Sequence, residues 1–404
     1  MRYNTGKSGA ATGLQGREVE GMRLAKRYRE MRPPEMVRMF QTIERMEGVL
    51  NLSIGEPDFD TEPDIVEAAA KAGYDGFTHY PPLQGFLDVR EAVCRYWERH
   101  HGLRADPGEV YMAVGGIQVA HLAFAALLDP GDEVLLVEPY FPPYVSQVEA
   151  NGGVPVAVPT REENGFAPTV EDLKRAVTSR TRGLLLNSPC NPSGRVVPRR
   201  QLEEIAEFVG EHDLFVLSDE IYESLVFHGE HVCLATFPGM RERTVTMAGL
   251  SKSHCMTGWR LGYGIAPEAL ARTMTVIASS QTYGLNSLAQ KAALYALDTQ
   301  DAKVLERRAI FAERVASVAE RLNAMKGVRC PPADGAFYLF PNISGSGLSS
   351  EDFSWRLLEE AKVATVPGSP FGRSGKGYIR IACTQSQDTL MRAMDAIEKF
   401  IDTL

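Results

Sequence analysis

Short apolar runs that alternate with amphipathic stretches constrain the fold of this chain more than any other feature. Apolar runs of four residues occur at 134–137, 183–186, 214–217 and 244–247. Around them lie stretches with helical periodicity, at 63–72, 87–100, 118–128, 170–176 and 200–210. Runs this short are typical of strands buried on both faces of a mainly parallel sheet that helices cover. The sequence therefore predicts a large α/β domain.

The C-terminal part of the chain has a different pattern. A long, charged amphipathic stretch covers residues 301–326, and shorter apolar stretches follow at 335–340, 363–366 and 378–381. This order of elements predicts a smaller α+β domain. We expect residues 52–304 to form the large domain, and residues 20–51 and 305–404 the small one. Residues 1–19 are rich in small and polar residues, which is typical of a flexible arm.

Charge and cysteine content exclude several classes of protein. Lysine and arginine number 43 against 52 acidic residues, a net charge of −9 that argues against a nucleic-acid or anionic-membrane partner. There is no apolar run of about 18 residues that could span a membrane. The six cysteines include no Cys-x-x-Cys pair, which indicates free thiols in a reduced compartment. With no apolar signal segment at the N-terminus, we expect a cytoplasmic protein.

The four histidines at positions 100, 101, 228 and 231 form two close pairs in the sequence. Their segments show no pattern of cysteine or carboxylate ligands at metal-binding spacing. We therefore expect them to be surface residues, and we expect no metal site.

Chemically informative side chains follow the four predicted strands. In chain order they are an aromatic ring, an amide, a carboxylate with a phenol, and a lysine with an arginine. These are Phe141, Asn191, Asp219 with Tyr222, and Lys252 with Arg260. Upstream, Gly115 and Gly116 precede an apolar helical stretch, and a helix N-terminus offers free N–H groups to a phosphate.

Each of these residues has a plainer interpretation when it is considered alone. Asp219 could cap a helix, Asn191 could form a turn, and Lys252 could be a surface lysine. Ligands of open parallel sheets, however, bind at the carboxyl ends of the strands, where these side chains converge. Together they predict a site for a flat, phosphorylated aromatic aldehyde with a ring nitrogen.

The chain resembles the class I pyridoxal-phosphate-dependent aminotransferases of fold type I, the aspartate and aromatic aminotransferase-like group. The resemblance extends from about residue 51 to 384 and rests on five segments, residues 80–92, 191–194, 219–222, 251–252 and 256–263. It implies a mainly parallel, seven-stranded sheet flanked by helices, with a smaller α+β domain. It also implies pyridoxal 5′-phosphate as the cofactor and a homodimer with shared active sites.

The resemblance assigns roles around the cofactor ring. Lys252 would form the internal aldimine and later move the substrate Cα proton. Asp219 would pair with the pyridinium nitrogen, and Asn191 and Tyr222 would hydrogen-bond the ring's phenolic oxygen. Phe141 would stack on the ring. The catalytic set is thus Lys252, Asp219 and Tyr222.

The resemblance also implies a phosphate site. Arg260 and the backbone around Gly116 and Ile117 would bind the phosphate, and Tyr80 would reach the phosphate of the neighbouring subunit. The chain departs from many relatives at Gly249, where they have a serine that contacts the phosphate.

The substrate side of the site would involve Arg380, Asn191 and Gly55. The Arg380 guanidinium offers a bidentate fork that matches the substrate α-carboxylate. The implied reaction is transfer of an amino group between an L-amino acid and a 2-oxo acid by a ping-pong mechanism, with 2-oxoglutarate as the default acceptor. A lyase, cyclase or oxidase acting on an amino acid remains an alternative on the same fold.

Overall fold

The computed structural model describes residues 35–404, and the chain divides into two compact units after Val49. The described part of the first unit contains helix α2 (Glu35–Ile43), in which Met39 is buried. The expected flexible arm, residues 1–19, lies outside the described residues, as does the start of the segment 20–51. The two units are described separately below.

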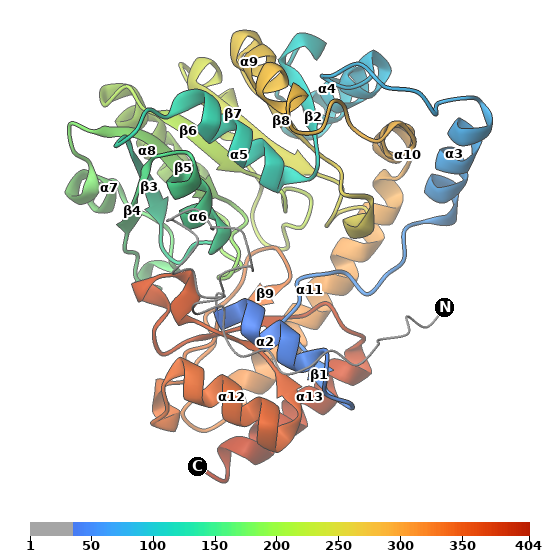
Figure 1. The fold of residues 1–404 in the computed structure, drawn as a ribbon. Helices are drawn as coiled ribbons and strands as arrows, with labels where there is room; N and C mark the ends of the chain where they lie inside the picture. The colour runs from blue at the N-terminus through green and yellow to red at the C-terminus, as the bar shows by residue number, and fades with distance from the viewer. Residues whose placement is uncertain (1–34) are drawn as a thin grey trace, which may run out of the picture. The chain divides into compact units, whose positions relative to one another are not determined.

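A seven-stranded sheet forms the centre of the second unit (Figure 1). In spatial order its strands are β2 (Val110–Ala113), β8 (Gly262–Ile265), β7 (Thr244–Gly249), β6 (Phe215–Asp219), β5 (Thr181–Asn187), β3 (Glu133–Val137) and β4 (Val154–Val158). β8 runs antiparallel to both of its neighbours, and the other pairs are parallel. The mainly parallel sheet is therefore confirmed, and the four predicted strands overlap β3, β5, β6 and β7.

Helices cover both faces of this sheet. They are α3 (Pro63–Tyr74), α4 (Leu87–His101), α5 (Gly116–Leu127), α6 (Pro143–Ala150), α7 (Val170–Ala176), α8 (Arg199–Glu211), α9 (Glu268–Ser279) and α10 (Ser287–Thr299). Alternate residues of β2 enter different cores: Val110 and Met112 pack with α4, whereas Tyr111 and Ala113 pack with α5. This alternation is the period-2 geometry of a strand buried on both faces.

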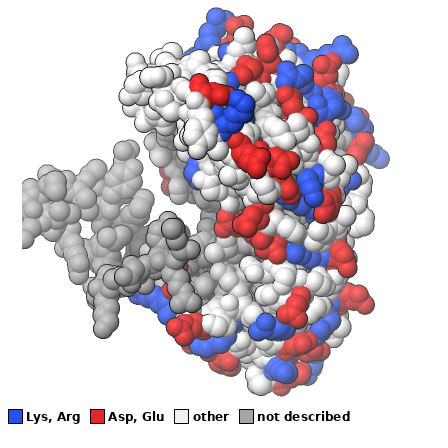
Figure 2. Space-filling model, turned by 90° about the vertical axis from the view of Figure 1, so that its right-hand side faces the viewer, with Lys and Arg blue, Asp and Glu red and all other residues white. Residues whose placement is uncertain are grey.

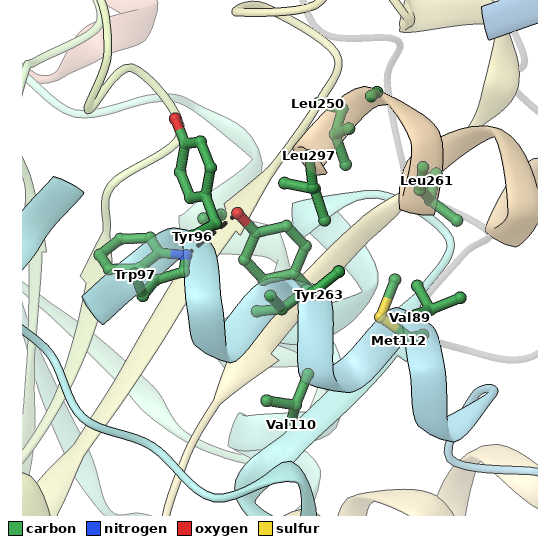
Figure 3. Packing of buried hydrophobic residues seen from close by; sticks show 14 of the residues in the cluster. Val89, Tyr96, Trp97, Val110, Met112, Leu250, Leu261, Tyr263 and Leu297 are labelled. Atoms are coloured by element: carbon green, nitrogen blue, oxygen red, sulfur yellow. Dashed lines mark hydrogen bonds between the residues drawn. The ribbon is translucent and has the colours of Figure 1, made fainter. Parts of the chain in front are cut away.

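The core beneath α4 is fixed by a polar contact as well as by packing. The indole nitrogen of Trp97 donates a hydrogen bond to the Tyr263 hydroxyl at 3.0 Å, between the helix and β8 (Figure 3). Both side chains are buried, so the bond satisfies two polar atoms that would otherwise be costly to desolvate. α4 ends at Gly102, whose φ of 68° is the left-handed conformation that often terminates helices.

The C-terminal residues form smaller sheets with their own core. Their elements are α11 (Asp301–Ala324), β9 (Tyr338–Leu339), α12 (Ser350–Ala361), β10 (Val363–Ala364), β11 (Val366–Pro367), β12 (Ile379–Ala382) and α13 (Gln387–Ile401). β12 pairs antiparallel with β11 and β9, while β10 pairs parallel with β1 (Leu50–Asn51). Val318, Phe353, Ile381 and Ile397 belong to a core cluster of their own. This is the α+β pattern that the sequence predicted.

The surface and the cysteines add three observations. Acidic and basic side chains are interspersed over the face seen in Figure 2, which shows no extended area of one sign. All six cysteines are free thiols. Within the described part of the chain, no helix combines the length and the apolar character needed to cross a bilayer.

The prediction that the four histidines are surface residues is wrong for two of them. His100 and His228 are exposed, but the side chains of His101 and His231 are only 7% and 5% exposed. His101 lies 3.3 Å from Glu223, and His231 lies 2.6 Å from Glu220. The carboxylate partner of His101 is distant in sequence, so nothing near this histidine in the sequence indicates its burial. Residues 35–404 contain no group of three or more His, Cys, Asp or Glu placed to hold a metal ion.

Candidate active site

The candidate residues gather at the carboxyl edge of the central sheet. Asn187 ends β5, Asp219 ends β6 and Gly249 ends β7, and the register pairs Asn187 with Asp219. The segments that follow these ends carry Asn191 and Lys252. The parallel register therefore brings together chemistry that is spread over more than sixty residues of sequence.

Lys252 is partly buried, and its ammonium group has a backbone partner. Its Nζ donates a hydrogen bond to the carbonyl oxygen of Gly55 at 2.8 Å. Burial, opposed by Glu56 and helped by Arg380 and Arg260, lowers the pKa of Lys252 to about 8. About a tenth of the Lys252 side chains are therefore neutral amines at pH 7, far more than for an ordinary lysine, and the neutral amine is the form that attacks a carbonyl carbon.

Asp219 is a buried carboxylate at the end of β6. One oxygen accepts a hydrogen bond from the Ile221 backbone N–H at 3.1 Å, and the other accepts from the Tyr144 hydroxyl. Burial raises the pKa of Asp219 to about 6 in spite of these donors. The group is ionised at pH 7 and can hold a proton on a cationic ring nitrogen. Tyr144 was not expected here, although its place in the aromatic segment after β3 was visible in the sequence.

Arg380 lies on β12 and is buried, but it forms no ion pair with any carboxylate in residues 35–404. Its Nη1 donates to the side-chain oxygen of Asn191 at 3.0 Å, and its Nη2 donates to the carbonyl oxygen of Ser53 at 2.6 Å. Its Nε has no partner, and burial lowers the pKa of the guanidinium. The guanidinium also lies over the rings of Tyr338 and Phe371, at 4.7 and 5.2 Å. A buried cation without a counter-ion suits an anionic ligand.

Tyr222 and Gly55 meet at a residue that the sequence did not reveal. The Tyr222 and Tyr338 hydroxyls are 3.0 Å apart, and burial raises the pKa of Tyr222 well above its usual value. A Cβ atom on Gly55 would lie 1.7 Å from the Tyr338 hydroxyl oxygen. Only glycine at position 55 therefore leaves room for Tyr338, and the carbonyl group of this glycine is the one that accepts from Lys252.

The first turn of α5 forms an anion-binding corner. Gly115 has a φ of 72°, and a Cβ atom on it would lie 2.9 Å from Arg260 Nη2. A Cβ atom on Gly262 would lie 2.6 Å from the Gly116 nitrogen, so two backbone segments approach closely. The N–H groups around Gly116 and Ile117, at the positive end of the helix dipole, and the Arg260 guanidinium are thus placed where one anion could contact them all.

The remaining candidates differ in their surroundings. Phe141 is partly buried, and its ring packs edge-on against Tyr144 with centroids 5.6 Å apart, so it borders the Asp219 side of the site. Tyr80 is 83% exposed, and its ring packs against that of Tyr283, 5.3 Å away. Tyr80 thus lies largely in solvent, and two other candidates, Ile117 and Arg260, are exposed as well. At Gly249, a Cβ atom would lie 3.0 Å from the β8 backbone, which leaves little room for a serine.

The protonation states and positions of these side chains match the groups of a phosphorylated pyridine aldehyde. The partly neutral Lys252 suits the aldehyde, the ionised Asp219 the ring nitrogen, and the α5 corner the phosphate. Arg380, which has no carboxylate partner in residues 35–404, is left to bind a substrate carboxylate. Fold and site together define an enzyme that uses pyridoxal 5′-phosphate to act on amino acids.

Comparison with known proteins identifies the family. Residues 47–397 match the family model of aminotransferase class I and II. The chain is 42% identical to aromatic-amino-acid aminotransferase 2 of Thermococcus litoralis, over 94% of this chain and 98% of that protein. It is also 42% identical, with the same coverage, to an aspartate aminotransferase of Pyrococcus abyssi. The solved structure of an aspartate aminotransferase from Rhizobium meliloti is 35% identical and superposes with a TM-score of 0.91, covering 95% of this chain and 99% of that one. The chain therefore belongs to aminotransferase class I and II, and it is a pyridoxal-phosphate-dependent aminotransferase of fold type I.

Proposed function

We propose that this aminotransferase moves the amino group of an L-amino acid to 2-oxoglutarate by a ping-pong mechanism. The observation that carries the proposal is the buried, unpaired Arg380 near the low-pKa Lys252. Amino donor and oxo-acid acceptor share an α-carboxylate, so one guanidinium can bind both in turn. Two substrates that use one carboxylate site in succession fit a ping-pong scheme.

Each side chain has a task in this proposal. Bound pyridoxal phosphate supplies a ring that withdraws electrons from the substrate Cα. Asp219 holds a proton on the ring nitrogen, and Tyr222 donates to the ring oxygen. Arg380 and Asn191 orient the carboxylate, so that the Cα–H bond faces the amine of Lys252. That amine would act as the general base that takes the Cα proton and as the general acid that later gives it back.

Aspartate and the aromatic amino acids are the donors that we propose. The support comes from the two relatives described above, which are equally similar to this chain and are named for these two substrate classes. A donor panel of aspartate, phenylalanine, tyrosine and alanine, with 2-oxoglutarate as acceptor, tests the proposal. Higher kcat/KM for alanine than for the other three would contradict it.

The ping-pong scheme is tested with the two half-reactions kept apart. Holoenzyme is incubated with ¹⁵N-labelled donor and no acceptor, and is then freed of small molecules by gel filtration. The first step should release about one oxo acid per active site. Unlabelled 2-oxoglutarate added afterwards should yield labelled glutamate. Release of free ammonia in the first step would indicate a lyase or an oxidase instead.

We further propose a homodimer in which Tyr80 of each chain completes the phosphate site of the other. The exposure of the Tyr80 and Tyr283 rings supports this, because exposed aromatic pairs are typical of interfaces. Light scattering should give twice the mass of the 44.5 kDa chain. Tyr80→Phe should weaken cofactor binding without changing that mass, whereas a monomeric holoenzyme with full activity would refute the proposal.

Two further proposals concern organisation and location. We propose that residues 52–304 act as the cofactor-binding domain and residues 305–404, with the segment 20–51, as a small domain. The separate core cluster among the C-terminal elements supports this division. The six free thiols support a cytoplasmic location.

A further inference from the structure

A cavity borders the segment that follows Tyr222, and none of the candidate active-site residues lines it. Its volume is about 450 Å³, within the range of small-molecule sites. Its wall comes from the end of α4, from the segment after Tyr222 and from the start of α11. Tyr96, next to Trp97 on α4 in Figure 3, is part of this wall.

The carboxylates in this wall already have partners within the chain. Glu223 accepts a hydrogen bond from the Tyr96 hydroxyl at 3.0 Å. Asp301 lies 3.2 Å from Arg99, and Glu230 lies 3.1 Å from an arginine of α8. The second oxygen of Glu223 is buried without a hydrogen bond but lies 3.3 Å from Nε2 of His101, so each of the three carboxylates has a nitrogen or hydroxyl group beside it.

Arg308 and Ser224 carry donor groups that have no partner among residues 35–404. Arg308 makes no hydrogen bond or ion pair with any residue in the described part of the chain. His231 lies 2.6 Å from Glu220 through Nε2, and a neutral imidazole that donates there leaves its buried, unpartnered Nδ1 as an acceptor. The Ser224 hydroxyl is buried and unpartnered as well. Unmet donors at buried positions are costly, and an anion that accepts from them removes the cost.

The rest of the wall limits the kind of anion. Val226, Val304 and Leu305 present aliphatic surface, which suits a short hydrocarbon chain. Glu223 and Asp301 line the same cavity and repel a second negative charge. The ligand chemistry is therefore a single negative charge on a small apolar body.

We propose that this cavity is an accessory binding site for a small aliphatic monocarboxylate. Its carboxylate accepts hydrogen bonds from Arg308 and Ser224, and its chain packs on Val226 and Val304. The site is separate from the substrate site at Arg380, so the proposal does not depend on the donor and acceptor proposed above.

Titration calorimetry with 3-methylbutanoate tests the proposal, since this acid has no amino or oxo group to react. The titration uses holoenzyme carrying Arg380→Ala, so that binding at the substrate site does not contribute. We expect one binding site per chain. Adding Arg308→Gln should weaken binding at least about tenfold, as for loss of a charge-assisted hydrogen bond. The control Arg272→Gln, an exposed arginine of α9 paired with Glu268, should leave binding unchanged.

A second variant and a second probe make the test decisive. Ser224→Ala removes one donor without a change of charge and should weaken binding about threefold. Inorganic phosphate, which is largely a dianion at pH 7.5, should bind at least about tenfold more weakly than the monocarboxylate. The proposal is overturned by absence of 3-methylbutanoate binding, by equal binding to the Arg308→Gln protein, or by tighter binding of phosphate.

Discussion

Replacing Asp219 by asparagine should stabilise the apoprotein. Burial raises the pKa of this carboxyl to about 6, from the 3.8 of an unperturbed aspartate. The folded chain therefore keeps the proton at pH values where the unfolded chain has lost it, and stability falls as the pH rises from 3.8 through 6. The difference between the two pKa values corresponds to a loss of about 3 kcal/mol in the free energy of unfolding at pH 7.5. At pH 5 most folded molecules are protonated, and the loss is about half as large.

Urea unfolding of the apoproteins, followed by circular dichroism at pH 7.5 and pH 5.0, measures this effect. The asparagine side chain keeps an amide oxygen as acceptor, so Asp219→Asn should raise the free energy of unfolding by up to about 3 kcal/mol at pH 7.5 and by about half as much at pH 5.0. Asp402→Asn, at an exposed position, is the control and should change neither value. A variant that is less stable than the wild type at pH 7.5, or equally stabilised at both pH values, would refute the reasoning.

The same substitution should lower the catalytic activity of the holoenzyme. Asp219 opposes folding because its charge is desolvated, and that desolvated charge pairs strongly with a cationic ring nitrogen. If the pairing recovers the same 3 kcal/mol in the transition state, kcat/KM falls on the order of 10²-fold. Steady-state kinetics with saturating cofactor measures this. Unchanged kcat/KM would remove Asp219 from the catalytic set.

Four further predictions concern the same site. Lys252→Ala should abolish turnover but leave the melting temperature of the apoprotein within a few degrees of wild type; transamination at the wild-type rate would refute its role. Because the pKa of Lys252 is lowered to about 8, formation of holoenzyme from apoprotein and pyridoxal phosphate should quicken with pH up to about 8 and level off above it, as stopped-flow absorbance would show. Arg380→Ala should raise the KM for both carboxylate substrates on the order of 10²-fold, as expected for loss of a charged, bidentate contact; an unchanged KM would exclude it from the site. Gly55→Ala should destabilise the protein by about 1–3 kcal/mol, because its Cβ would lie 1.7 Å from the Tyr338 hydroxyl, whereas Gly210→Ala, which has open space around it, should not.

The sequence predicted the parts of the fold whose residues carry a local pattern. The strands β3, β5, β6 and β7 contain short runs rich in apolar residues. α7 was predicted with its observed bounds from its helical periodicity, and the structure shows a capping box of Thr169 and Asp172 at its start. β8 was not predicted, since its sequence Gly-Tyr-Gly-Ile has no uniform apolar run. Its glycines are explained only by tertiary contacts, such as the approach of Gly262 to the Gly116 backbone.

The same limit applies to the site. Lys252, Asp219 and Asn191 were found because they follow strand ends, where local order and topology agree. Tyr338 was missed because its contact with Tyr222 joins residues 116 positions apart, and no local pattern marks it. The burial of His231 was missed because its carboxylate partner cannot be recognised without the fold.

The charged groups of the active site share a property that no motif encodes. Asp219, Lys252 and Arg380 all have pKa values displaced by burial toward the neutral form, so each is held where its charge is unfavourable. Within residues 35–404, Arg380 has no carboxylate partner and the hydrogen bond of Lys252 goes to a carbonyl oxygen. Three ligand groups would each stabilise one of these side chains: a cationic ring nitrogen for Asp219, an aldehyde for Lys252 and a substrate carboxylate for Arg380. The displaced pKa values of these three residues therefore indicate which ligand groups the site binds, because each ligand group would stabilise one of the three side chains.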